Sequence, residues 1–348
     1  MRVLVTGGAG FIGSHVVDEL VGLGMDVRVA DVLLPAAHRG TPDYLNPAAD
    51  FARVDVCDET GVRALVSDVD AVCHQASMVG LEVSFSDVCD YVYNNDLGTA
   101  VLLKSLEATS FRGRLVLASS MVVYGEGVYS CPEHGRIRPL ARRAEDLDAG
   151  RFEPPCPECG RPLRPHAVTE SCATDPRNVY AATKLHQEHL CFAYGRQSGA
   201  AVVALRYHNV YGPRMPRGTP YAGVASIFRS ALELGQAPEL FEDGQQLRDF
   251  VHVRDVARAN ALCLTSAQPV QGAFNVASGE TRTVRDMAEA LRAAFGAAAP
   301  RPVISGRYRL GDVRHVFASP RRARESFGFE AAVPFELGMK ELATTPLR

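Results

Sequence analysis

The chain has 348 residues, of which 47% are hydrophobic and 22% charged, and its formal net charge is −3. A chain of this length and apolar content can bury a large core, which excludes a wholly disordered protein. The small net charge argues against nucleic acid or an anionic membrane as a partner. No apolar run reaches bilayer length, and the first strand begins at Arg2 without room for a signal peptide, so a cytoplasmic protein is expected.

Short β-branched runs alternate with longer helical patterns up to about residue 205. The predicted strands are residues 2–5, 26–31, 51–55, 71–74, 114–118 and 201–207, and the predicted helices are 11–23, 60–67, 87–109 and 178–197. This alternation predicts an α/β fold with a Rossmann-type, doubly wound parallel sheet in residues 1–205. The alternation then stops. Residues 206–249 and 276–348 are expected to form a smaller C-terminal substrate-binding lobe, while a strand and helix in 250–275 return to the main sheet.

A glycine-rich turn follows the first predicted strand. Gly7, Gly10 and Gly13 stand between that strand and a helix, where backbone N–H groups can approach a pyrophosphate. The second strand ends at Asp31, the position from which a carboxylate meets the ribose of an adenosine. This pattern predicts a dinucleotide site that favours NAD over NADP. His38 and Arg39 nearby leave use of both cofactors open.

Tyr180 and Lys184 lie four residues apart on a predicted helix and therefore share one face. Four further segments accompany them: Thr6–Ser14, Ser119–Gly125, Arg206–Arg214 and Arg248–Val253. Jointly these motifs resemble those of the extended short-chain dehydrogenase/reductases, and among them the NAD-dependent nucleotide-sugar epimerases and dehydratases. The resemblance covers nearly the whole chain.

The resemblance implies a role for individual residues. It gives Ser120, Tyr180 and Lys184 as catalytic. It gives NAD as the cofactor, bound by Gly7, Gly10, Phe11, Ile12, Gly13, Asp31, Asp55, Val56, Ala76, Asn95, Tyr180 and Lys184. It gives a nucleotide-sugar substrate, bound by Ser120, Asn209, Tyr221, Val224, Arg248, Arg309 and Asp312. It also implies a homodimer in which helices 87–109 and 178–197 pair across the interface.

The chemistry of a sugar hydroxyl narrows the reaction. Hydride leaves carbon readily when the attached hydroxyl loses its proton, and Tyr180 is the expected base if Lys184 and the nicotinamide ring lower its pKa. Relatives that eliminate water carry acidic groups after the Ser120 position, whereas Met121 and Val122 stand there. The prediction is therefore inversion at C4 of a UDP- or dTDP-hexose through a 4-keto intermediate. A dehydratase, a decarboxylase, a 4-ketoreductase and a non-catalytic NAD-binding protein remain alternatives.

Residues 128–167 exceed what most relatives carry between Ser120 and Tyr180. The pattern Cys131-Pro-Glu-His134 recurs as Cys156-Pro-Glu-Cys159, and such pairs of ligands suit a tetrahedral structural Zn²⁺ site of the zinc-knuckle type. Cys172 or His166 are alternatives to His134 as the fourth ligand. The insert resembles one in a subgroup known as dTDP-L-rhamnose 4-epimerases. Its place between Ser120 and Tyr180 suggests a lid over the sugar site.

Overall fold

The computed structural model describes residues 1–38, 40–80, 85–218 and 223–348. Two residues considered above, Arg39 and Tyr221, lie outside the described part of the chain. Within it, no helix is both long enough and apolar enough to cross a bilayer.

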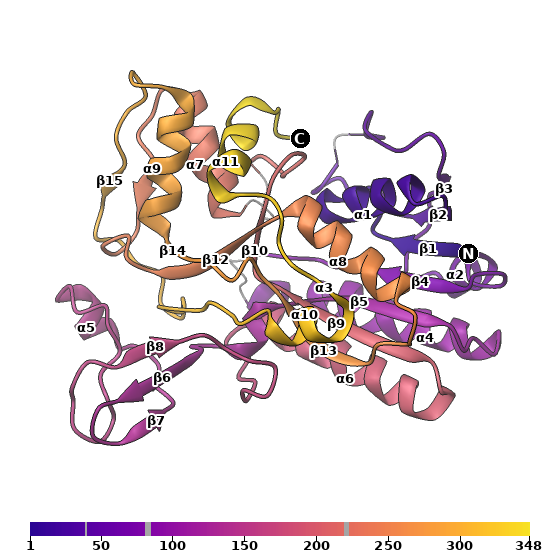
Figure 1. Ribbon diagram of the computed structural model, residues 1–348, viewed down its shortest axis with the longest axis horizontal. Coiled ribbons are helices and arrows are strands. Elements are labelled where there is room, and N and C mark those ends of the chain that lie inside the picture. Colours follow the sequence, from indigo (N-terminus) through magenta and orange to yellow (C-terminus); the bar gives the residue numbers. More distant parts are fainter. Residues whose placement is uncertain (39, 81–84, 219–222) are drawn as a thin grey trace.

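A seven-stranded parallel sheet forms the centre of the larger domain (Figure 1). Its order is β13-β9-β5-β4-β1-β2-β3. The strands are β1 (Arg2–Thr6), β2 (Asp26–Ala30), β3 (Asp50–Ala52), β4 (Ala71–His74), β5 (Arg114–Ser120), β9 (Ala201–Tyr207) and β13 (Gly272–Val276). Strands buried on both faces need nearly continuous apolar runs, as in β4 and β9, where every residue is buried. Six of these strands were predicted. β13 was not.

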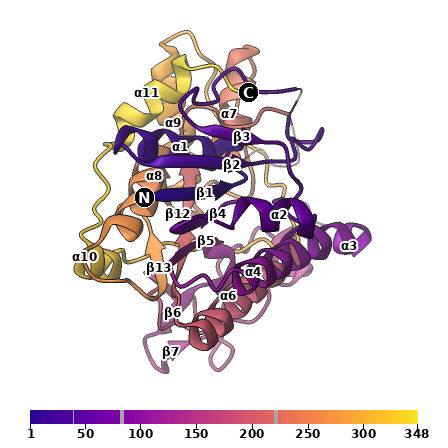
Figure 2. The same ribbon diagram turned by 90° about the vertical axis from the view of Figure 1, so that its right-hand side faces the viewer.

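Helices cover both faces of this sheet, which makes it doubly wound. On one side, α1 (Phe11–Gly22), α8 (Val253–Thr265) and α10 (Arg321–Phe327) share a core with the strands. On the other side, α2 (Glu59–Leu65), α4 (Gly98–Ala108) and α6 (Val179–Ser198) share a second core. Figure 2 shows α4 and α6 together on one side of the strands and α8 and α10 on the other.

The single helix predicted for residues 87–109 is interrupted. It begins as a 3₁₀ turn at Phe85–Asp87, continues as α3 (Val88–Tyr91), widens into a π-helical stretch at Val92–Leu97, and ends as α4. π-helical turns often mark functional sites, because the extra residue re-aims a side chain. The buried Asn95 lies in this stretch.

The smaller lobe has its own sheets and core. β12 (Leu247–His252) pairs in parallel with β10 (Asn209–Tyr211) and antiparallel with β14 (Thr281–Thr283), and β11 (Glu239–Leu240) pairs with β15 (Val303–Ile304). Helices α7 (Val224–Glu233), α9 (Val284–Phe295) and α11 (Phe335–Thr344) pack on them. The strand expected to return to the main sheet near residue 250 is therefore β12 of this lobe. An apolar run does not specify its partner strands, and only α8 and β13 belong to the larger domain.

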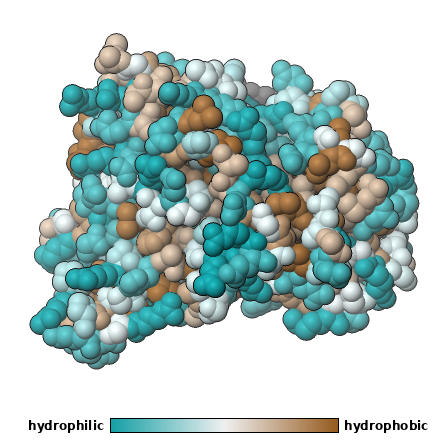
Figure 3. Space-filling view, viewed as in Figure 1, coloured by the Kyte–Doolittle hydropathy of each residue, from teal (hydrophilic) through white to brown (hydrophobic). Residues whose placement is uncertain are grey.

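The insert is a separate small unit at the lower left of Figure 1. β6 (Val128–Cys131) pairs antiparallel with both β7 (Gly135–Ile137) and β8 (Arg164–His166), and α5 (Ala144–Asp148) lies beside them. Its buried apolar cluster consists of Tyr129, Cys131, Cys156 and Leu163, and Leu147 of α5 is buried outside this cluster. Figure 3 shows that its outward surface is mostly hydrophilic.

Candidate active site and metal centre

A cavity of about 370 Å³ lies between the carboxyl ends of the central strands and the smaller lobe. Ligand sites of doubly wound sheets occur at such ends, where the strand order reverses. Here the order reverses between β1 and β4. The predicted residues that line this cavity are Gly7, Gly10, Phe11, Ile12, Gly13, Asp31, Asp55, Val56, Ala76, Ser120, Tyr180, Lys184, Asn209 and Val224.

The glycine turn brings the backbone close to neighbouring atoms. A Cβ on Gly7, whose φ is +67°, would lie 2.6 Å from the backbone nitrogen of Ala76, and one on Gly13 would lie 2.2 Å from the carbonyl oxygen of Gly7. No side chain caps the N-terminus of α1, which begins at Phe11. Its first N–H groups are therefore available to an anion in the cavity, as a pyrophosphate requires.

Asp31 is fixed by backbone donors at the end of β2. Its Oδ2 accepts from the N–H of Ala9 at 3.1 Å, and its Oδ1 accepts from the N–H of Leu33 at 2.9 Å. His38 approaches Asp31 to 4.0 Å, but burial lowers the pKa of His38 below its ordinary value. His38 is therefore mainly neutral near pH 7 and does not offset the carboxylate charge. This environment suits a ribose diol better than a 2′-phosphate.

Ser120, Tyr180 and Lys184 converge on the cavity from two elements. Ser120 ends β5, and its Oγ accepts from the N–H of Val122 at 3.4 Å. Tyr180 and Lys184 lie in the first turns of α6, which Asn178 caps by accepting from the N–H of Ala181 at 2.8 Å. Tyr180 and Ser120 hydrogen bond through their side chains.

The protein groups alone do not lower the pKa of Tyr180. Burial raises it, and the hydrogen bond with Ser120 offsets only part of the rise. Burial also lowers the pKa of Lys184 to about 7. Desolvation opposes the charged forms of both groups, and the joint role of Lys184 and the nicotinamide ring in lowering the pKa of Tyr180 stays a prediction.

A chain of buried hydrogen bonds fixes Lys184. Its Nζ donates to Oε1 of Gln187 at 3.0 Å, and Nε2 of Gln187 donates to Oγ1 of Thr99 at 2.7 Å. Thr99 also bonds the ring of His74 at 3.0 Å, and the other ring nitrogen of His74 bonds Thr6 at 2.7 Å. The ammonium is thus tied to β4 and β1 across the interior of the domain.

Asn95, expected at the cofactor, lies behind the cavity wall. Its Oδ1 accepts from the N–H of Met78 at 2.7 Å, and its Nδ2 donates to Oγ1 of Thr183 at 3.0 Å. Met78 lines the cavity after β4, and Thr183 precedes Lys184 on α6. Asn95 therefore orders two parts of the wall without forming it.

Arg248, Arg309 and Asp312 form a second cluster beside the cavity and do not line it within the described residues. The guanidinium of Arg248 donates to the carbonyl oxygens of Val313 and Arg314, each at 2.8 Å. The guanidinium of Arg309 lies 5.0 Å from the ring centre of Phe241. Burial raises the pKa of Asp312, while neighbouring arginines oppose the rise.

Several lining residues were missed by sequence reasoning. Arg348 donates to Tyr44 Oη at 3.0 Å beside the Asp31 end of the cavity. This contact joins residues far apart in the sequence, so no local pattern predicts it. His208 is buried in the wall, where burial lowers its pKa to about 3. His208 precedes Asn209 in the motif Arg206–Arg214, and this position could have been used to predict that His208 lies at the cavity.

Apolar side chains occupy the wall next to Ser120. Met121 and Val122 both line the cavity. Among the lining residues that the structure describes, the carboxylates are Asp31 and Asp55, both in the part formed by β2 and the loop after β3. The described wall thus offers no carboxylic acid beside Ser120.

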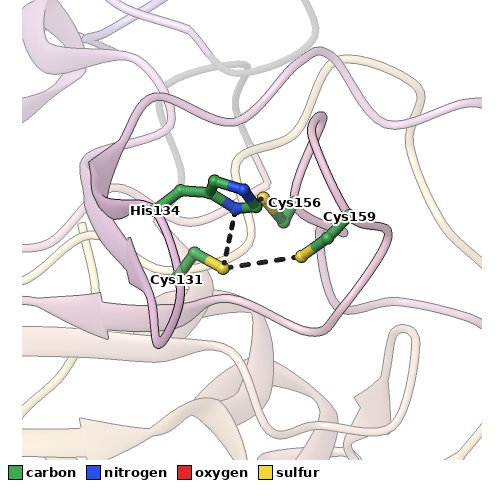
Figure 4. A group of neighbouring side chains, drawn as sticks. All are labelled: Cys131, His134, Cys156 and Cys159. Atoms are coloured by element: carbon green, nitrogen blue, oxygen red, sulfur yellow. Dashed lines mark hydrogen bonds between the residues drawn. The ribbon is translucent and has the colours of Figure 1, made fainter.

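The insert brings four potential metal ligands together (Figure 4). Sγ of Cys131 lies 3.6 Å from Sγ of Cys159 and 3.5 Å from Nδ1 of His134, and Sγ of Cys156 lies 3.6 Å from the same nitrogen. Ligands of tetrahedral Zn²⁺, at roughly 2.0–2.3 Å from the metal, lie about 3.5–3.8 Å apart. The set therefore fits zinc.

Two alternative ligands lie elsewhere. His166 bonds Oγ of Ser130 at 2.7 Å, and Cys172 contacts Oγ1 of Thr169 at 3.4 Å. Neither belongs to the group of ligand atoms within 4.8 Å of one another. No residue of 128–167 contributes to the described cavity wall, and the lid that its place in the sequence suggests stays a prediction.

Comparison with known proteins agrees with this geometry. The chain is 31% identical over 350 residues to a dTDP-L-rhamnose 4-epimerase of Burkholderia thailandensis, covering 99% of this chain and 94% of that protein. A UDP-glucose 4-epimerase of Thermus thermophilus, solved with NAD, superimposes with a TM-score of 0.77 at 31% identity and covers 99% of this chain and 98% of its own. A UDP-N-acetyl-alpha-D-glucosaminuronate decarboxylase of Bacillus cytotoxicus is 30% identical over 83% of this chain and 78% of that protein.

The family model described as "NAD dependent epimerase/dehydratase family" matches residues 3–277. This range contains the glycine turn, Ser120, Tyr180 and Lys184. The chain belongs to the NAD-dependent epimerase/dehydratase family, within the extended short-chain dehydrogenase/reductases.

Proposed function

We propose that this protein is an NAD-dependent 4-epimerase of a nucleotide-activated hexose, carried by UDP or dTDP. The observation that carries the proposal is the convergence of Ser120, Tyr180 and Lys184 on one cavity whose described wall has no acid beside them. Epimerisation needs one base and a reversible hydride transfer, whereas elimination of water must move a second proton. The dTDP-sugar and UDP-sugar 4-epimerases among its relatives support the same assignment.

The residues of the cavity suit the two halves of this reaction. The glycine turn, the N-terminus of α1 and Asp31 would hold NAD, which when bound accepts the hydride from C4 and returns it. Ser120 holds the O4 hydroxyl against Tyr180, and Tyr180 removes its proton. Lys184 and the charge of the bound nicotinamide favour the phenolate. After the 4-keto sugar presents its other face, Tyr180 returns the proton to the same oxygen.

The direct test is incubation of the purified protein with UDP- and dTDP-hexoses, uronates and 6-deoxyhexoses, read by NMR and mass spectrometry. Inversion at C4 with unchanged mass is expected for at least one sugar. Uronates are expected to react poorly, because the family resemblance implies threonine in glucuronate 4-epimerases at the position of Asn209. Loss of water or CO₂ would instead assign the protein to the dehydratases or decarboxylases.

Removing the phenolic hydroxyl of Tyr180 tests the base. Tyr180→Phe is expected to lower kcat by about 10²- to 10⁴-fold, because O4 loses its proton acceptor, with little change in KM or bound NAD. Tyr91→Phe is the control, since its ring lies 6.3 Å from that of Tyr180 and it lines no described part of the cavity. A Tyr180→Phe enzyme with wild-type kcat would show that another group is the base.

Burial of Lys184 predicts a pH dependence of stability. Its pKa is lowered to about 7 in the folded protein and is about 10.4 in an unfolded chain, so above pH 7 the unfolded chain binds a proton that the folded protein does not. The free energy of unfolding of the cofactor-free protein should therefore rise with pH between about 7 and 8.5, by at most about 1.4 kcal/mol per pH unit. Raised pKa values of buried cysteines and tyrosines act in the opposite direction at higher pH.

Urea unfolding at several pH values measures this effect. Lys184→Met should flatten the rise, whereas Lys104→Met, which removes an exposed lysine paired with Glu59, should leave it unchanged. If the free energy of unfolding rises equally with pH in wild type and Lys184→Met, Lys184 is not the group responsible for the rise.

The second part of the proposal is a structural Zn²⁺ bound by Cys131, His134, Cys156 and Cys159. The purified protein should contain about one zinc per chain by elemental analysis. Cys156→Ser should lose it, because three ligands remain, whereas Cys172→Ser should retain it since Cys172 lies outside the cluster. Equal metal content in the two variants would argue against this site.

We further infer a homodimer in the cytoplasm, formed through the α3–α4 region and α6. Three apolar side chains of the π-helical stretch are exposed next to one another, Val92 by 44%, Tyr93 by 50% and Leu97 by 43%. Leu97→Glu should yield monomers in light scattering, because it places a carboxylate in an apolar contact. Leu23→Glu, 55% exposed beside the end of α1, should leave the dimer intact. A monomeric wild type, or a dimeric Leu97→Glu, would contradict this interface.

A further inference from the structure

Arg142, in the insert, makes a buried contact with the smaller lobe. Its Nη1 lies 2.8 Å from Oε1 of Glu242, and the two side chains are 5% and 3% exposed. Its Nη2 donates to the carbonyl oxygen of Asp312 at 2.7 Å. One guanidinium thus bonds two separate segments of the lobe, and such two-pronged contacts fix geometry as well as supplying energy.

The contact with Asp312 adds a third hydrogen bond to the backbone of the same loop. The carbonyl oxygens of Val313 and Arg314 accept from Arg248, and that of Asp312 accepts from Arg142. Three successive carbonyls are therefore held by two guanidiniums. One of these belongs to the lobe itself, and the other comes from the insert.

The contact with Glu242 supports the turn in which Glu242 lies. Glu242 has a positive φ of 55°, which is unfavourable for a residue with a side chain. Its carboxylate holds this conformation by pairing with Arg142 and, through Oε2 at 2.7 Å, with Nη1 of Arg314. The preceding residue, Phe241, supplies the ring over which the guanidinium of Arg309 lies at 5.0 Å. Arg142 therefore supports both sides of the segment that contains Arg309 and Asp312.

We propose that Arg142 is a positioning residue for the nucleotide-diphosphate end of the substrate. It holds loop 309–314 in the conformation from which Arg309 and Asp312 meet the ligand. This inference rests on the proposed function and on the substrate role that the family resemblance implies for those two residues, which lie beside the described cavity wall. It makes the insert a part of the substrate site that acts from outside the cavity.

Arg142→Ala tests the inference, with the adjacent Arg143→Ala as its matched control. Arg143 is 73% exposed and pairs with Glu145 inside the insert, so its loss removes the same charge without touching the lobe. Arg142→Ala should raise KM for the nucleotide sugar, and Kd for UDP or dTDP in calorimetry, by about tenfold or more, since it loses charged hydrogen bonds. kcat and bound NAD should stay near wild type, and Arg143→Ala should match wild type throughout.

Arg142→Lys separates position from charge. Lysine keeps the charge but lacks the planar fork, so it should recover only part of the lost affinity. It also replaces Arg142→Ala if that variant does not fold. Unchanged KM and Kd in the folded Arg142 variant overturn the inference, as does a fall in kcat and NAD content together with affinity, which is the mark of general destabilisation.

Failure of the proposed function gives a different result. A wild-type protein that converts no nucleotide sugar but binds UDP or dTDP more tightly than Arg142→Ala refutes the epimerase and supports the role of Arg142. A wild-type protein that binds neither nucleoside diphosphate overturns the role of Arg142 as well.

Discussion

The reversal of strand order at β1 is the constraint on which the site depends. The chain first builds outward from β1 through β2 to β3, and then returns to place β4 and β5 on the other side. Because all strands are parallel, the segments that leave their carboxyl ends must diverge at this point, and a crevice opens between them. The glycine turn after β1, Asp31 after β2 and Ser120 at the end of β5 all reach this crevice for the same topological reason. The site therefore needs no dedicated scaffold beyond the sheet and the lobe that closes it.

The proposed catalysis places a second demand on the same core, since Lys184 is buried beside the partly buried Tyr180 and needs a hydrogen-bond partner there. Burying an ammonium group is unfavourable in free energy, and this desolvation lowers the pKa of Lys184. The hydrogen bond from Lys184 to Gln187 and its continuation through Thr99 satisfy the group and fix its position. The π-helical stretch turns Asn95 inward to bond Thr183, so that the irregular helix contributes to the same arrangement. Stability and the proposed chemistry are linked here, because the groups that pair the buried lysine also fix its position in the cavity wall.

Local pattern predicted the features that depend on neighbours in sequence. The apolar runs predicted six strands of the central sheet, and the glycine spacing predicted the turn after β1. The repeated Cys-Pro-Glu pattern predicted the cluster of potential metal ligands. Features that depend on distant partners were missed or misplaced. β12 and β13 join different sheets, because their partner strands, which lie elsewhere in the sequence, decide this. Arg248 was expected to face the substrate, whereas in the structure its guanidinium bonds the carbonyls of the loop that contains Asp312. The contact of Arg142 with the lobe could not be predicted from local pattern, since its two partners there lie at least 100 residues away in sequence.

A bound metal would help the insert to make the contact between Arg142 and the smaller lobe. The insert's buried apolar cluster of Tyr129, Cys131, Cys156 and Leu163 is too small to order a proline-rich segment by apolar burial alone. Two of those four residues are also candidate zinc ligands, so metal and core would close the same loops together. A guanidinium held by a flexible segment would lose much of its hydrogen-bond energy to the entropy of ordering that segment. A metal bound by the insert would remove this cost before any substrate arrives, and Arg142 would then hold the lobe with a geometry that a mobile loop does not provide.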